Sequence, residues 1–74
     1  MWIAKKDVFY NLNKFEFVEM HEGNGDKWSV EIKNLSKDLP ICLKCDVTKE
    51  EAEETFDEIY KALEHGRNGV LRYE

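Results

Sequence analysis

Short runs of apolar residues at both ends of the chain indicate strands. Residues 2–4 and 8–10 consist mostly of aromatic and β-branched side chains, which favour strands, and residues 41–46 after Pro40 form the third predicted run. Pro40 suits the first position of the third of these runs, because a proline has no N–H to give to a ladder. Residues 70–73 have the composition of a last strand.

The clearest strand pair lies in the middle of the chain. Residues 15–20 and 27–33 flank Asn24-Gly25, a dipeptide that adopts the positive φ angles of a hairpin turn. The second run alternates apolar and polar residues, as a half-buried strand does. Its apolar positions are Trp28, Val30 and Ile32.

The pattern changes to a helical period after residue 47. Thr48 and Glu51 form a capping box, which begins a helix, and Gly66 is a typical helix end. We therefore expect a helix over about residues 48–65, with one apolar stripe. The stripe consists of Ala52, Phe56, Ile59, Tyr60 and Leu63.

Together these elements predict a single α+β domain over residues 1–74. We expect a mostly antiparallel sheet of four to five strands, with the helix packed on one face. The predicted core joins the hairpin to the helix. Its members are Trp28, Val30, Ile32, Phe56, Ile59 and Leu63.

In the run before the hairpin turn, the apolar residues switch from one side of the predicted strand to the other. Phe15 and Phe17 alternate with polar residues, whereas Val18 and Met20 fall on the opposite side. Either a bulge shifts the phase or both faces of the sheet carry apolar side chains. In the second case one helix leaves a face uncovered, and a two-fold homodimer is the commonest way to cover it. Val18 and Met20 are then the predicted interface.

Composition and charge narrow the possible partners. Of the 74 residues, 42% are hydrophobic and 36% charged, with a net charge of -5. Residues 1–45 are neutral, and the whole excess of acid lies in residues 46–74. No basic stripe is present, which disfavours nucleic acid, although aromatic side chains could stack on bases. No apolar segment reaches the length of a membrane span or a signal peptide, so we expect a cytoplasmic protein without membrane contact.

Cys42 and Cys45 form the one motif-like pair. Within a strand, residues three apart lie roughly 10 Å apart between Cα atoms, whereas a disulfide needs less than about 7 Å. We therefore expect two reduced cysteines that cannot bridge, with Cys45 on the apolar face. A metal or redox site at this pair is the alternative. Zinc would also require His21 and His65, which are far apart in the sequence and lack the usual ligand spacing.

The helix has a crowded acidic face that could dock a basic partner or remain solvated. Two of its i,i+4 pairs, Glu50–Glu54 and Glu54–Glu58, are repulsive. The face comprises Glu50, Glu53, Glu54, Asp57 and Glu58.

No glycine-rich phosphate loop or nucleophile elbow is present in the sequence, so we expect no enzyme activity and no cofactor. The segment Tyr10-Asn11-Leu12-Asn13-Lys14-Phe15, the hairpin and the Glu-Glu-Ala helix together resemble small uncharacterised bacterial and phage proteins. This resemblance covers nearly the whole chain and implies several strands, one helix and a terminal strand, but no activity or site residue.

Three functions follow as expectations. The first is a non-catalytic protein-interaction module, homodimeric or bound to another protein. The second is a metal- or redox-active module at Cys42 and Cys45. The third is a module that binds single-stranded nucleic acid through aromatic side chains of the sheet.

Overall fold

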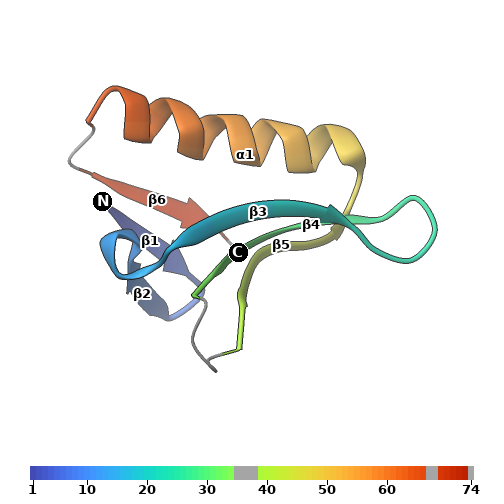
Figure 1. Cartoon of the computed structure of the whole chain (residues 1–74), viewed down its shortest axis with the longest axis horizontal. Coiled ribbons are helices and arrows are strands. Elements are labelled where there is room, and N and C mark those ends of the chain that lie inside the picture. The colour runs from blue at the N-terminus through green and yellow to red at the C-terminus, as the bar shows by residue number, and fades with distance from the viewer. Residues whose placement is uncertain (35–38, 67–68, 74) are drawn as a thin grey trace.

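The computed structural model describes residues 1–34, 39–66 and 69–73. These segments form six strands, one short 3-10 turn (η1) and one α-helix, with the helix lying above the strands (Figure 1). In chain order the elements are β1 (Trp2–Lys5), β2 (Val8–Asn11), η1 (Leu12–Lys14), β3 (Phe17–Glu22), β4 (Trp28–Lys33), β5 (Ile41–Val47), α1 (Lys49–Glu64) and β6 (Val70–Tyr73).

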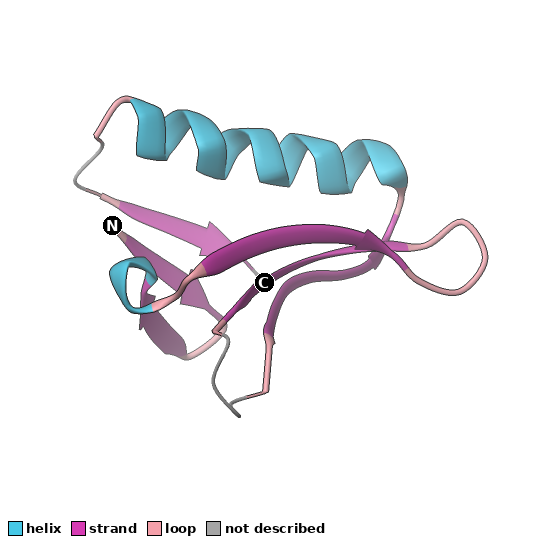
Figure 2. Cartoon of the chain, viewed as in Figure 1, coloured by secondary structure: helices cyan, strands magenta, loops and turns pink. Residues whose placement is uncertain are grey.

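The strands form two sheets, which corrects the expectation of a single sheet of four to five strands. Sheet A has the order β2-β1-β6 and sheet B the order β3-β4-β5. Sheet B is antiparallel throughout, whereas β6 runs parallel to β1 in sheet A. Leu12 is buried in η1, which lies between β2 and β3 (Figure 2). The chain thus leaves the first sheet at a tight turn and starts a second one.

The predicted hairpin and helix ends are confirmed. Gly25 has a φ of 64° in the turn between β3 and β4, whereas Asn24 does not have the positive φ expected of it. The Thr48 hydroxyl accepts a hydrogen bond from the Glu51 N–H at 3.2 Å, and this cap satisfies one of the amides left open at a helix start. Gly66 has a φ of 61° directly after the helix, as a left-handed stop requires.

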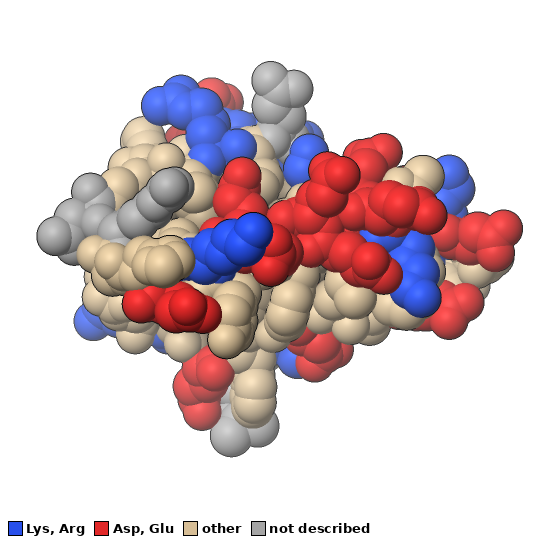
Figure 3. Space-filling view, turned by 90° about the horizontal axis from the view of Figure 1, so that it is seen from above, with Lys and Arg blue, Asp and Glu red and all other residues tan. Residues whose placement is uncertain are grey.

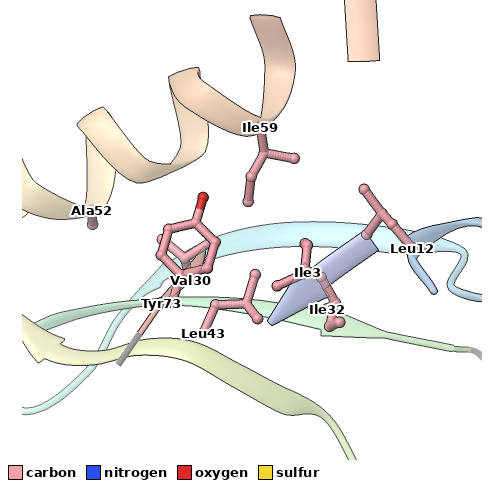
Figure 4. Packing of buried hydrophobic residues seen from close by; sticks show 8 residues of the cluster. All are labelled: Ile3, Leu12, Val30, Ile32, Leu43, Ala52, Ile59 and Tyr73. Carbon is pink, nitrogen blue, oxygen red and sulfur yellow. The ribbon is translucent and has the colours of Figure 1, made fainter. Parts of the chain in front are cut away.

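The core draws on both sheets and the helix. Figure 4 shows Ile59 pointing down from α1 toward the strands, and the Tyr73 hydroxyl pointing up toward the helix. The Tyr73 hydroxyl donates to the Glu58 carboxylate at 2.7 Å. The buried cluster consists of Ile3, Leu12, Val30, Ile32, Leu43, Ala52, Ile59 and Tyr73.

The buried stripe of α1 differs from the predicted one. Ala52 and Ile59 are buried as expected, but the three larger residues of the predicted stripe are exposed, Phe56 at 36%, Tyr60 at 59% and Leu63 at 52%. The helix instead faces the sheets with mostly small side chains, namely those of Ala52, Thr55, Ile59 and Ala62. Large side chains of the strands already fill the layer below the helix, so small residues let it approach closely. Trp28, also predicted as core, is half-buried.

Within the described residues, no helix has the length and apolar character needed to cross a membrane.

Candidate interaction site

The phase change in the sequence is resolved at the start of β3. The register pairs Phe17 with Lys33, yet the Glu16 N–H also donates to the Lys33 carbonyl at 3.2 Å. Phe15 and Glu16 lie before β3, whose register with β4 has no shift from Phe17 to Glu22. Phe15 and Val18 both pack against the core, while Phe17 is 40% exposed. The apolar pattern therefore changes sides where the strand begins, and the described β3–β4 pairs contain no bulge.

An apolar groove lies between α1 and this end of β3. Its volume is about 410 Å³. The helix supplies one wall with the large side chains of Phe56, Tyr60 and Leu63. The other wall and the floor come from Leu12, Asn13, Phe15, Glu16, Phe17, Val18 and Ile59. The groove therefore exists because the large apolar residues of the helix lie beside the core and not inside it.

The backbone of β3 borders the groove and forms an edge of sheet B. β3 pairs with β4 on one side, and no other described strand pairs with it. The Gly23 N–H donates to the Lys27 carbonyl at 2.8 Å, so the alternation of an antiparallel ladder directs the N–H and C=O groups of Phe17, Glu19 and His21 toward β4. The same groups of Val18, Met20 and Glu22 point to the outer edge.

Val18 and Met20, the predicted interface, are half-buried. Both side chains pack against the core on the helix side of sheet B. They do not form a separate apolar face on the far side of the sheet, as the second alternative in the sequence required. Their contribution to an interface is through the edge of the strand and the groove, where Val18 is a lining residue.

Two ion pairs occupy the opposite face of sheet B. Lys33 Nζ lies 2.8 Å from Glu19 Oε2, and His21 Nε2 lies 2.9 Å from Glu31 Oε1. The hydrogen bond from Lys33 holds the pKa of the Glu19 carboxyl below its usual value. Basic and acidic side chains thus alternate between β3 and β4 on this face.

The acidic face of the helix lies on the solvent side of α1 (Figure 3). Glu50, Glu53, Glu54 and Asp57 line a shallow surface there. Two i,i+4 ion pairs partly neutralise it, Lys49–Glu53 at 3.9 Å and Lys61–Asp57 at 3.0 Å. Glu58 is set apart from these residues, since it accepts the hydrogen bond from Tyr73.

Cys42 and Cys45 form a disulfide, contrary to expectation. Their Cα atoms are 6.0 Å apart instead of roughly 10 Å. The register explains the difference: from Trp28↔Val47 to Val30↔Lys44, β5 uses three residues against two of β4. A second shift follows between Val30 and Glu31. These bulges shorten the strand locally and bring the two cysteines together.

The two cysteines and the two histidines are not arranged as the ligands of a metal ion. Cys45 is exposed, whereas its expected neighbour on the apolar face, Leu43, is fully buried. His65 follows the last turn of α1, and His21 is engaged with Glu31. Among the described residues, no group of three or more His, Cys, Asp or Glu side chains is arranged to hold a metal ion.

A second apolar surface, which the sequence analysis missed, is the outer face of sheet A. Trp2 pairs with Val70 and Ala4 pairs with Phe9 and Arg72, so these side chains share one face. Trp2 is 46% exposed and Phe9 is 61% exposed. The alternation of Trp2 with the buried Ile3 was a signal for this face, but the run was too short to show which face would be covered.

The fold also redistributes the charge. The described segments 1–14 and 69–73, which contain sheet A, carry four basic side chains and one acidic side chain. The other described residues carry five basic and thirteen acidic side chains. Because β6 returns to pair with β1, Arg72 joins the N-terminal lysines, and the acidic excess is left on α1 and sheet B.

Comparisons with protein-family models, with curated proteins and with solved structures gave no match.

Proposed function

We propose that this protein is a small protein-interaction module that acts as a homodimer, and that the groove between α1 and β3 is its binding surface. The observation that carries the proposal is the position of Phe56, Tyr60 and Leu63, which line the groove although smaller residues of the same helix are buried. Large side chains that a helix does not need for its own core are costly to leave in water and mark interaction sites when they cluster.

A second copy is the occupant that best satisfies both parts of this surface. The groove needs an apolar cover, and the outer edge of β3 needs hydrogen-bonding partners. An isologous two-fold contact provides both at once, because a chain that pairs with the edge of β3 also lies beside the groove that this strand borders. A chain of 74 residues also buries only about 60% of its unfolded surface when it folds alone, a smaller share than a larger domain buries, so further burial on association is favourable.

The test is native mass spectrometry of the freshly purified, chelator-free protein at micromolar concentration. We expect a dimer at twice the chain mass of 8.8 kDa. Leu63→Asp should give monomers, because a carboxylate would be desolvated in the covered groove. Leu39→Asp is the matched control: Leu39 is 85% exposed and does not line the groove, so this variant should remain dimeric. A monomeric wild-type protein, or equal behaviour of the two variants, would contradict the proposal.

A second candidate function is binding of single-stranded nucleic acid on the outer face of sheet A. Trp2 and Phe9 are exposed aromatic side chains on one face of sheet A, and Arg72 lies on the same face beside them. Diagonal neighbours on a sheet lie about 7–8 Å apart, a spacing at which two successive bases can stack while cations contact the phosphates.

Fluorescence anisotropy with labelled oligo(dT) at low salt tests this second candidate. Phosphate attraction is strongest there, so binding should be detectable and should weaken with Phe9→Ala. Arg72→Gln should reduce the dependence of the binding constant on salt, because one phosphate contact is lost. Absence of binding at low salt would exclude the candidate.

A further inference from the structure

The open edge of β3 and the charges beside it define how two copies would meet. We propose that the two chains pair their β3 strands antiparallel about a two-fold axis at Met20, so that two sheets B become one six-stranded sheet. This inference rests on the proposed homodimer and adds its geometry. It is argued from the direction of the backbone groups, from the side chains on each face and from the helix.

The backbone fixes which residues can pair. Val18, Met20 and Glu22 present their N–H and C=O groups to the outer edge, as derived from the β3–β4 ladder. Hydrogen bonds between two copies must therefore join residues from this set. Met20 can face the Met20 of the second copy, with Val18 opposite Glu22 on either side of the axis.

The charged face of sheet B favours this register over the neighbouring ones. With the axis at Met20, Glu19 of each chain lies opposite His21 of the other. Basic and acidic side chains then alternate across the interface: Lys33 and Glu19 of one chain are followed by His21 and Glu31 of the second chain. This row joins the two ion pairs already present within each chain. An axis at Glu19 would place two carboxylates opposite each other, which is destabilising. An axis at His21 would place two imidazoles opposite each other, and Glu19 would no longer lie opposite a histidine of the second chain.

The helix side is compatible with the same axis. Both α1 helices lie on the same side of the joined sheet, because a two-fold axis perpendicular to a sheet keeps its faces. Each groove lies at the start of its own β3, beside Val18. Because Val18 lies opposite Glu22 in this register, each groove faces the hairpin end of β3 of the second chain, and the same operation completes the edge of the sheet.

Single-cysteine variants in a Cys42→Ser/Cys45→Ser background test the register. Met20→Cys should form a disulfide-linked dimer on mild oxidation, because directly opposed residues lie about 5.5 Å apart between Cα atoms, within the range of a disulfide. Val18→Cys and Glu22→Cys should each fail to link to themselves, since each pair would be offset by four residues. When these two variants are mixed, they should link to one another.

The outcomes separate this inference from the proposed function. A protein that is dimeric by native mass spectrometry but does not link through Met20→Cys, or that links Val18→Cys to itself, uses another surface or register, and the inference is then wrong while the homodimer stands. A monomeric wild-type protein would overturn both. If circular dichroism shows that Met20→Cys does not fold, the mixture of Val18→Cys and Glu22→Cys decides alone, linkage supporting the register and its absence overturning it.

Discussion

The two flanks of helix α1 differ in how they are held. Toward β6, the Tyr73 hydroxyl donates to Glu58 at 2.7 Å and ties the helix to sheet A. Toward β3, Phe56, Tyr60 and Leu63 line an open groove. The buried stripe of small residues runs between the two flanks. One flank of the helix is therefore tied to sheet A by a hydrogen bond, and the other presents apolar side chains in an open groove.

The largest expected effect distinguishes the buried stripe from the groove wall. Ile59→Ala should lower the free energy of unfolding by about 2–5 kcal/mol, because Ile59 is 1% exposed and its removal leaves a cavity. Leu63→Ala should cost the monomeric protein less than about 1 kcal/mol, because half of that side chain is already in water. Urea unfolding below the concentration of dimer formation measures both. Equal losses would mean that Leu63 belongs to the core.

The second prediction concerns the flank of α1 that faces β6, where Tyr73 bonds to Glu58. Tyr73→Phe should lower the free energy of unfolding by about 1.5–3 kcal/mol at neutral pH, because a hydrogen bond to a carboxylate is lost. Burial, with the Glu58 carboxylate beside it, raises the pKa of Tyr73 above its usual value near 10. The unfolded chain therefore releases this proton at a lower pH than the folded chain does, and stability should fall as the pH rises above about 10.

Urea unfolding at pH 8, 10 and 11 checks the pH dependence, with Tyr73→Phe as the control. The variant should lose less stability than the wild-type protein over this range, because it lacks the proton that the folded chain retains. The other two tyrosines are present in both proteins and contribute equally. Parallel decline of both proteins would show that Tyr73 is not the group responsible.

The smallest effect is expected at the disulfide, which lies in β5 just before the start of the helix. Reduction of Cys42–Cys45 should lower the free energy of unfolding by at most about 2 kcal/mol, since the bond closes a very short loop and restricts the unfolded chain little. Urea unfolding with and without reductant measures this. Cys42→Ser/Cys45→Ser should behave as the reduced protein and should retain the native dimer mass, because neither flank of α1 is altered.

The sequence could predict elements that depend on neighbouring residues. The hairpin follows from Asn24-Gly25 and the alternation after it, and the helix follows from Thr48, Gly66 and the helical period. Each of these signals acts within a few residues, through a dihedral angle or a single hydrogen bond. The α+β class and the position of the single helix follow from the same signals.

The site could be predicted only in part, because it depends on how elements meet. The sequence identified Val18 and an apolar helix stripe as significant, but not the groove between them. It also placed Cys42 and Cys45 in a regular strand, where they cannot bridge, because the bulges in β5 arise from its register with β4. A bulge depends on the partner strand, so its position is hard to derive from one strand alone.

The amino-acid sequence by itself determined the local elements of this protein, including the hairpin, both ends of α1 and the alternation of β4. The tertiary structure decided the division into two sheets, the rotation of the helix that exposes Phe56 and Leu63, and the gathering of basic residues around sheet A. The physical reason is one of range. Turns and caps depend on contacts between near neighbours, whereas the face that a helix buries depends on the side chains that already fill the layer beneath it.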